Sequence, residues 1–249
     1  VVDAADNARA LGQTMPLIAG FRATVVPPQV PRPDLYVIAK RGGSGRTELH
    51  RLSGASDYTA FNRNVATALQ QAGADRVWKF LVGDYNRDGV KDLFLILREV
   101  HVLNGASGFT GFLLNTGSAL HPTDVTGAWD YTIGDVDRDG FLDVIAINKT
   151  GPDRTKLHAL SGAANYRAFA RHAATALTAV GTSNAWDFKA GDANGDGFVD
   201  LYVLLRTGAS GTTEVHVMDG ATNYQTWLLH RATALHQTGD DYAWDFDLG

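Results

Sequence analysis

The feature that most constrains the fold of this chain is an internal repeat. A tryptophan opens a short apolar segment four times, and successive copies lie 51, 57 and 58 residues apart, at Trp78, Trp129, Trp186 and Trp244. A histidine, a glycine turn and an aromatic pair recur in the same order between the tryptophans. Repeats with periods of about 20 to 50 residues are typical of solenoids, propellers and arrays, because one unit cannot bury its apolar face alone.

The repeat region divides into four units, at residues 34–83, 84–134, 135–191 and 192–249. Most segments within a unit are short, rich in β-branched residues and bounded by Gly or Asp, which favours strands. Four strands per unit predict an all-β fold, a β-propeller of four blades with four antiparallel strands each. A stacked β-solenoid is the less favoured alternative.

One segment of each unit suits either a helix or a strand. Phe61, Val65 and Leu69 are spaced by four in the first unit, but Gly111 and Gly117 interrupt the matching stretch of the second. A helix would lose about 1 kcal/mol per glycine relative to alanine. We therefore predict a strand here in all four units. The turns before these segments carry a glycine at 54, 105, 162 and 220, which we expect to have a positive φ.

Residues 1–33 match no repeat. The stretch 25–33 is rich in proline and reads as extended chain, and residues 7–15 suit one or two helical turns. The segment is therefore either a linker from an upstream domain or a brace across the closure of the ring, and the sequence favours neither.

The strongest chemical signal is the nine-residue pattern D-x-[D/N]-x-D-G-x-x-D, which occurs three times. Oxygen ligands at positions one, three and five, a glycine at six and a backbone carbonyl at seven are how a protein loop wraps Ca²⁺. An aspartate at position nine completes each set, and we expect the loops to lie between blades. The predicted ligands are Asp84, Asn86, Asp88, Val90 and Asp92 in loop 1, Asp135, Asp137, Asp139, Phe141 and Asp143 in loop 2, and Asp192, Asn194, Asp196, Phe198 and Asp200 in loop 3.

Three copies in one register argue against simple solvated turns, because the loops crowd ten aspartates that repel one another unless a cation lies among them. An EF-hand is excluded because position twelve holds Leu95, Ala146 and Val203 instead of a bidentate glutamate. Mg²⁺ is disfavoured because it keeps more of its water. We predict three Ca²⁺ sites, which would take the formal net charge from −5 to +1.

These loops, each followed by an Asp-Leu-type strand, resemble FG-GAP/VCBS repeats, and the resemblance covers about residues 34–249. Trp-x-Phe, the acidic loop, Glu-Val-His and Ser-Gly-Ala-x-x-Tyr make the unit similar to repeats of secreted bacterial proteins. The resemblance implies a β-propeller with calcium in blade-connecting loops, and a lectin-like, adhesive or hydrolase-associated role. Two departures are Lys156, where the other units have glutamate, and a shortened second unit between Leu97 and Glu99.

The histidines at 50, 101, 158 and 216 fit a repeat consensus that is hydrogen-bonded within or between blades better than a ring of ligands. The tryptophans fit an inter-blade core, whereas Tyr58, Tyr166 and Tyr224 follow turns and are better placed for exposure. The pairs Ser53–His50 and Ser161–His158 lack a nucleophile elbow. We assign no catalytic residue, although groups assembled across the ring would escape this reading.

Composition excludes several functions. A net charge of −5 with scattered Lys and Arg argues against nucleic-acid binding, and no apolar run is long enough to enter and span a membrane. The absence of cysteine excludes disulfides and thiolate sites. We expect a secreted, non-catalytic module that binds a glycan or another cell-surface polymer. A polysaccharide-active or other hydrolytic enzyme with its site at a propeller mouth, a protein-binding scaffold and self-association stay open.

Overall fold

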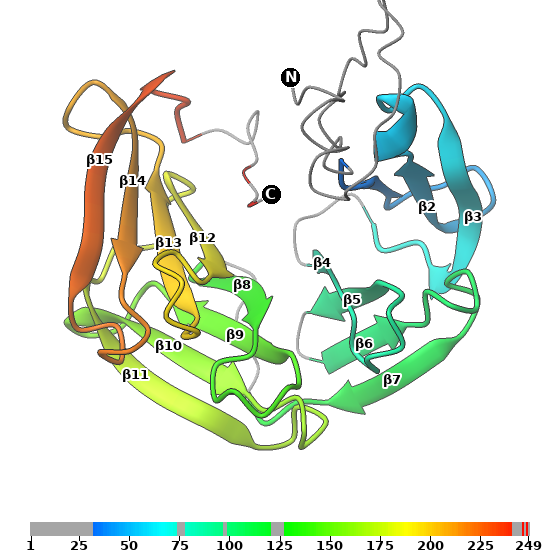
Figure 1. Ribbon diagram of the computed structural model, residues 1–249, viewed down its shortest axis with the longest axis horizontal. Helices are drawn as coiled ribbons and strands as arrows, with labels where there is room; N and C mark the ends of the chain where they lie inside the picture. The colour runs from blue at the N-terminus through cyan, green and yellow to red at the C-terminus, as the bar shows by residue number, and fades with distance from the viewer. Residues whose placement is uncertain are drawn as a thin grey trace, which may run out of the picture.

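The computed structural model describes residues 32–73, 78–96, 99–120, 127–240, 246 and 248. The chain is an all-β, four-blade propeller whose antiparallel sheets stand side by side in an arc (Figure 1). Its only described helix is the 3₁₀ turn Gly54–Ser56. Among the described residues, no helix is long and apolar enough to cross a membrane.

The strands of each blade run in chain order from the centre outward. Blade 1 contains β1 (Leu35–Ala39), β2 (Arg46–Leu52) and β3 (Phe61–Gln70). Blade 2 contains β4 (Lys79–Gly83), β5 (Asp92–Ile96), β6 (Glu99–Leu103) and β7 (Phe112–Gly117). Blade 3 contains β8 (Trp129–Gly134), β9 (Asp143–Asn148), β10 (Arg154–Leu160) and β11 (Phe169–Thr178). Blade 4 contains β12 (Trp186–Gly191), β13 (Asp200–Leu205), β14 (Thr212–Met218) and β15 (Trp227–His236).

The sheets are offset by one strand from the repeat units of the sequence. The tryptophan strand that ends a unit is the first strand of the next sheet, so β4 pairs with β5 and not with a strand of blade 1. The acidic loops therefore lie within blades, and the expectation that they lie between blades is wrong. The reason is local, because each loop closes a hairpin in which Gly83 opposes Asp92, Gly134 opposes Asp143 and Gly191 opposes Asp200.

The ambiguous ten-residue segment is a strand. It forms the outer strands β3, β11 and β15, and its shorter equivalent in blade 2 is β7. The helix alternative is thereby excluded for the described blades. Residues 1–31, including the expected helical turns, and Trp244 lie outside the described residues.

The apolar core lies between neighbouring blades. Inner strands have neighbours on both faces, so Leu93, Phe94 and Leu95 of β5 are all fully buried, as expected of a continuous apolar run. One cluster joins blades 1 and 2, a second joins blades 2 and 3, and a third joins blades 3 and 4. The tryptophans Trp78, Trp129 and Trp186 pack against these clusters, which confirms their assignment to the core.

The turn aromatics correct a prediction. Tyr166 and Tyr224 are 0% and 1% exposed, and only Tyr58, at 38%, has the exposure that their place after a turn led us to expect. Tyr166 and Tyr224 lie in the apolar clusters that join their blades to the preceding ones, and their hydroxyls donate to the carbonyls of Leu142 and Val199 at 3.0 Å.

The turn glycines also differ from expectation, because none of the four has a positive φ. Each is required by a close approach instead. A Cβ at Gly105, Gly162 or Gly220 would collide with the backbone carbonyl at position eight of the acidic loop in the same blade. The turn and the acidic loop therefore pack backbone to backbone.

Three of the four repeated histidines make a hydrogen bond within their blade, as predicted, whereas the buried Nδ1 atom of His101 has no hydrogen-bond partner in the described part of the chain. His158 and His172 approach at 2.8 Å between their Nδ1 atoms, and so do His216 and His230. His50 instead pairs with the Oδ1 atom of Asn64 at 2.9 Å. These contacts link β2 to β3, β10 to β11 and β14 to β15, and among the described residues they form no ring around the propeller axis.

Candidate metal centre

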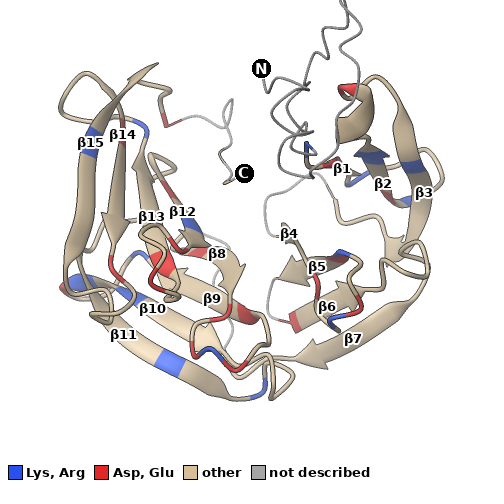
Figure 2. Cartoon of the chain, viewed as in Figure 1, with Lys and Arg blue, Asp and Glu red and all other residues tan. Residues whose placement is uncertain are grey.

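The three acidic loops occupy the same place in three blades, between the first and second strands. Figure 2 shows the Asp and Glu segments at these loops, spaced along the arc. Strand pairing fixes the two ends of each loop, so its oxygen-bearing side chains are gathered over a short hairpin. All fifteen predicted ligand positions lie in the described part of the chain.

The loops share one pattern of backbone hydrogen bonds, which loop 2 illustrates. The carboxylate of Asp135 at position one accepts from the amides of Asp139 and Gly140 at 3.1 and 3.0 Å. The carboxylate of Asp139 accepts from the amide of Phe141 at 2.8 Å. Gly140 has a φ of 89°, the left-handed conformation that position six requires. Loops 1 and 3 repeat these contacts at the equivalent residues.

The aspartate at position nine is the buried floor of each loop. Asp92, Asp143 and Asp200 are 0% exposed. Each accepts two backbone amides, one from position two of its own loop and one from the turn glycine of its blade, at 2.7 to 3.0 Å. Position nine thus joins the loop to the turn.

The electrostatics at position nine favour a cation. The pKa of Asp143 is raised to about 6, chiefly by burial and in addition by the carboxylates of Asp137 and Asp139, against the backbone hydrogen bonds that lower it. Burial likewise raises the pKa of Asp92 and Asp200. A divalent cation among these oxygens would relieve both the desolvation and the repulsion.

Loop 2 brings three carboxylates to one point. Oxygens of Asp135, Asp137 and Asp143 all lie within 4.8 Å of one another. Loops 1 and 3 replace the central carboxylate with the amides of Asn86 and Asn194, whose oxygens are also ligands for a hard cation. The donors are oxygens only, and a glycine permits the tight turn, so the residues fit Ca²⁺.

Neighbouring loops touch through cation–π contacts. The guanidinium of Arg87, at position four of loop 1, lies 3.9 Å from the ring centroid of Phe141 in loop 2. Arg138 of loop 2 lies 4.1 Å from the ring of Phe198 in loop 3. Both arginines have a positive φ, 61° and 62°, and the phenylalanines are at position seven. Positions four and seven, which the ligand pattern leaves unspecified, therefore connect one loop to the next.

Sequence reasoning also missed a group of buried charges on and beside the inner strands. Lys79 of β4 and Asp130 of β8 are 2.6 Å apart, although Asp130 is only 4% exposed. Burial acts to raise the pKa of Asp130, but Lys79 and Lys189 hold it below its ordinary value. Arg206 lies 3.4 Å from Asp187. The Trp-Asp dipeptides at 129–130 and 186–187 were the available signal.

The remaining cation of this region is Lys149, which is 4% exposed and donates to the carbonyl of Ser183 at 3.1 Å. Burial lowers the pKa of its ammonium group. The pair Lys79–Asp130 thus joins the inner strands of blades 2 and 3, whereas Arg206–Asp187 lies within blade 4.

A comparison with protein families identifies the repeat that contains loop 2. A family model described as an FG-GAP-like repeat matches residues 135–203, which run from position one of loop 2 into β13. No match to a curated protein was found. The matched repeat and the four blades of one design together support the FG-GAP/VCBS propeller family for this chain.

Proposed function

We propose that this propeller binds three Ca²⁺ ions and acts as a non-catalytic binding module for glycans or other cell-surface polymers. The observation that carries the calcium part is the threefold recurrence of one loop, with the same amide contacts at position one and the same buried aspartate at position nine. An extracellular location suits such loops, because calcium modules outside the cell operate at dissociation constants of about 10⁻⁴ to 10⁻³ M.

The metal would reduce the repulsion among the carboxylates of each loop. Positions one, three, five and nine would supply side-chain oxygens, and Val90, Phe141 and Phe198 would supply backbone carbonyls. Because Asp143 also binds the amide of Gly162, an ion at loop 2 would brace the turn of blade 3 as well.

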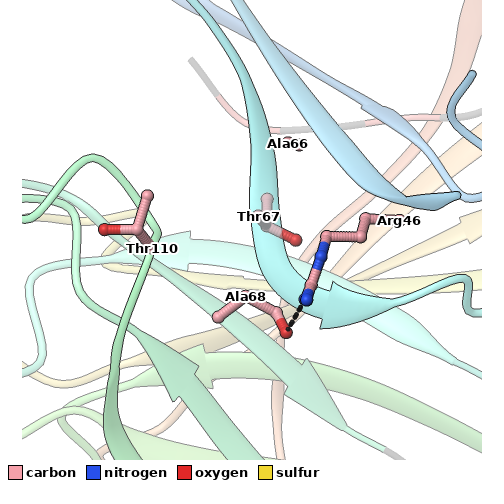
Figure 3. A pocket seen from close by; sticks show the side chains of 5 residues that line it. All are labelled: Arg46, Ala66, Thr67, Ala68 and Thr110. Carbon is pink, nitrogen blue, oxygen red and sulfur yellow. Dashed lines mark hydrogen bonds between the residues drawn. The ribbon is translucent and has the colours of Figure 1, made fainter. Parts of the chain in front are cut away.

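The binding part has a candidate surface between blades 1 and 2. A pocket of about 420 Å³ is lined by Arg46, Ala66, Thr67, Ala68 and Thr110, and Arg46 supplies a guanidinium there (Figure 3). Arg46 is held there by donating to the carbonyl of Ala68 at 2.9 Å. A guanidinium in a pocket of this size suits the hydroxyls of a sugar.

Calcium binding is tested by titration calorimetry and by thermal unfolding with Ca²⁺ and with excess chelator. We expect three bound ions and a clear rise in melting temperature. The variant Asp139→Ala should lose one ion, whereas Asp153→Ala, which removes an exposed acid outside the loops, should keep three. An unchanged melting curve after verified removal of metal would refute structural calcium.

Polymer binding is tested on a glycan panel and on bacterial cell-wall fragments with Ca²⁺ present. Weak binding should strengthen on densely displayed ligand, because several contacts then act together. Arg46→Ala should weaken it more than Arg154→Ala, the equivalent arginine of blade 3, which contacts the carbonyls of Thr175 and Ala176. Turnover of a polymer would favour the enzyme, and capture of one protein without glycan binding would favour the scaffold.

A further inference from the structure

Each described junction between blades is made from the same two faces. The leading face consists of the first and third apolar residues of a blade's second strand, and it packs on the preceding blade. These residues are 0–1% exposed in blades 2, 3 and 4, at Leu93 and Leu95, Val144 and Ala146, and Leu201 and Val203. The trailing face of the preceding blade receives them within the three apolar clusters.

A backbone hydrogen bond accompanies each junction. The amide of an alanine in or just after the outer strand of one blade donates to the carbonyl of the turn aromatic in the next. The pairs are Ala68 with Phe109 at 2.9 Å, Ala119 with Tyr166 at 2.9 Å, and Ala176 with Tyr224 at 2.8 Å. A leading face is therefore recognisable by two buried apolar residues and an accepting turn aromatic.

Blade 1 carries this leading face uncovered. Leu35 and Val37, which correspond to Leu93 and Leu95, are 50% and 41% exposed. The turn aromatic Tyr58 is 38% exposed, against 0–1% for its three equivalents. Large apolar residues exposed at positions that are buried in every other repeat indicate a surface that another blade covers.

Blade 4 carries the matching trailing face. Val215 is half-buried, although its equivalents Leu49, Val100 and Leu157 are 0–1% exposed. Ala234, the counterpart of Ala68, is exposed, and within the described part of the chain its amide makes no such contact with a turn aromatic.

The trailing face of blade 4 already holds the beginning of a further blade. Arg206 lies 5.3 Å from the ring of Phe246, as Lys40 of blade 1 lies 5.4 Å from the ring of Phe80 in blade 2. Leu248 lies beside Gly191 as Ile133 of blade 3 lies beside Gly83. Phe246 and Leu248 thus take the places of first-strand residues, whereas the described part of blade 1 has three strands, with β1 at the inner edge.

We propose that the leading face of blade 1 docks on the trailing face of blade 4 of a second copy of this chain. The two faces stand at opposite ends of the arc (Figure 1), so the described blades 1 and 4 do not complete this junction within one chain. A junction between unlike faces is heterologous, and two copies that exchange it reciprocally close a ring with twofold symmetry. The chain itself makes the same contact three times, which argues for its own blade as the occupant.

The test uses the absence of cysteine in this chain. Tyr58→Cys and Ala234→Cys each place one thiol at the two residues that the junction would join by a backbone hydrogen bond. The two variants are mixed in Ca²⁺ buffer and treated with a short thiol crosslinker. We expect a covalent heterodimer, while Ala234→Cys mixed with Ser210→Cys, an exposed position on the β13–β14 loop, should give none.

The double variant Tyr58→Cys/Ala234→Cys distinguishes the sources of the partner blade. Crosslinked dimers that disappear on dilution before treatment support the proposal, and a crosslink confined to single chains at all concentrations would overturn it in favour of closure within one chain. Sedimentation gives an independent readout. Val37→Lys should shift a dimer to monomer, whereas Phe112→Lys, at an exposed apolar residue of blade 2 outside both faces, should not. A monomeric parent chain at millimolar concentration would also overturn the proposal.

Discussion

Blades 1 and 3 contain the same repeat aspartate, just before β1 in blade 1 and at the start of β9 in blade 3, in two different electrostatic settings. Asp34 and Asp143 each accept the amide of their turn glycine at 2.9 Å. The hydrogen bond from Gly54 is the main cause of a lowered pKa at Asp34, where Asn62 and Arg51 add to the effect. The pKa of Asp143 is raised to about 6, chiefly by burial and in addition by loop carboxylates.

The difference separates two roles of the position-nine aspartate, the hydrogen bond that holds the turn of its blade and the binding of a cation. Both residues hold the turn of their blade, so that role needs no acidic loop. Asp34 has Arg51 at 3.4 Å as a built-in positive partner. The charged residues that act on the pKa of Asp143 are Asp137 and Asp139, both negative, so the ionised carboxylate of Asp143 is disfavoured in the folded state without metal.

The largest expected effect comes from neutralising these two residues with calcium present. At about 100 times the dissociation constant, one site contributes about 2.7 kcal/mol to the free energy of unfolding. Asp143→Asn should lose about that calcium-dependent stability at loop 2, whereas Asp34→Asn should keep the full response to Ca²⁺. Chemical denaturation of both variants with Ca²⁺ and with chelator measures this difference. Equal calcium responses would remove the proposed role of position nine.

A smaller, calcium-independent loss is expected at Asp130. This buried aspartate of blade 3 has Lys79 at 2.6 Å as its cation, so it resembles Asp34 more than Asp143. Asp130→Asn should lower the free energy of unfolding by about 2 kcal/mol, the contribution typical of a hydrogen bond to a charged group. The loss should be the same in Ca²⁺ and in chelator. A loss of stability that appears only with Ca²⁺ would show that Asp130, like Asp143, depends on the bound ion and not on Lys79 alone.

The sequence predicted the blades because repetition made local ambiguity resolvable. Gly111 and Gly117 of blade 2 decided the strand assignment for its longer equivalents, and β3, β11 and β15 confirm it. The offset between units and sheets was not predictable in the same way. A repeat has no intrinsic beginning, so only strand pairing, as between Gly83 and Asp92, shows where a sheet starts.

The burial of the turn aromatics could not be predicted from the sequence. Tyr166 follows a turn, and a residue after a turn is ordinarily near solvent. It is buried instead by the preceding blade, whose apolar residues share a cluster with its ring, whereas Tyr58 has nearly the same φ of 64° and is 38% exposed. The contacts of Arg87 with Phe141, and of Lys79 with Asp130, join different repeats, and a pattern read along one repeat cannot reveal them.

A third effect should arise where loops 1 and 2 meet. Arg87 places a positive charge beside loop 2 without being a ligand, and its stacking on Phe141 holds the residue that supplies the position-seven carbonyl. An exposed cation–π contact contributes about 0.5–1 kcal/mol. Arg87→Ala should therefore weaken calcium binding at loop 2 by up to about fivefold. The control Lys91→Ala also removes a positive charge from loop 1 but leaves the contact between Arg87 and Phe141 in place.

Calorimetry on a chain whose loops 1 and 3 are disabled by Asp88→Ala and Asp196→Ala isolates loop 2 for that measurement. Weaker binding in Arg87→Ala but not in Lys91→Ala supports a positioning role of the stack. If both variants bind more tightly than their parent, repulsion between arginine and Ca²⁺ dominates, and the stack is not what holds loop 2.

The smallest effect concerns the histidine pairs, in which blades 1 and 3 differ again. His158 faces His172, and burial first, then the neighbouring imidazole and Lys156, lower its pKa below the ordinary value of 6.5. The folded state therefore binds this proton less readily than the unfolded chain, so stability is complete above about pH 6.5 and falls as the pH decreases below it.

His172→Asn gives blade 3 the pairing that His50 and Asn64 have in blade 1. The substitution removes the repulsion from the second imidazole but leaves His158 buried. The free energy of unfolding should therefore depend less steeply on pH between pH 7 and 5. The change in slope should be well under about 1.4 kcal/mol per pH unit, which is the contribution of one whole proton. Denaturation across that range in chelator, which removes any calcium contribution, measures the slope, and a slope identical to that of the parent chain would show that burial alone sets the titration of His158.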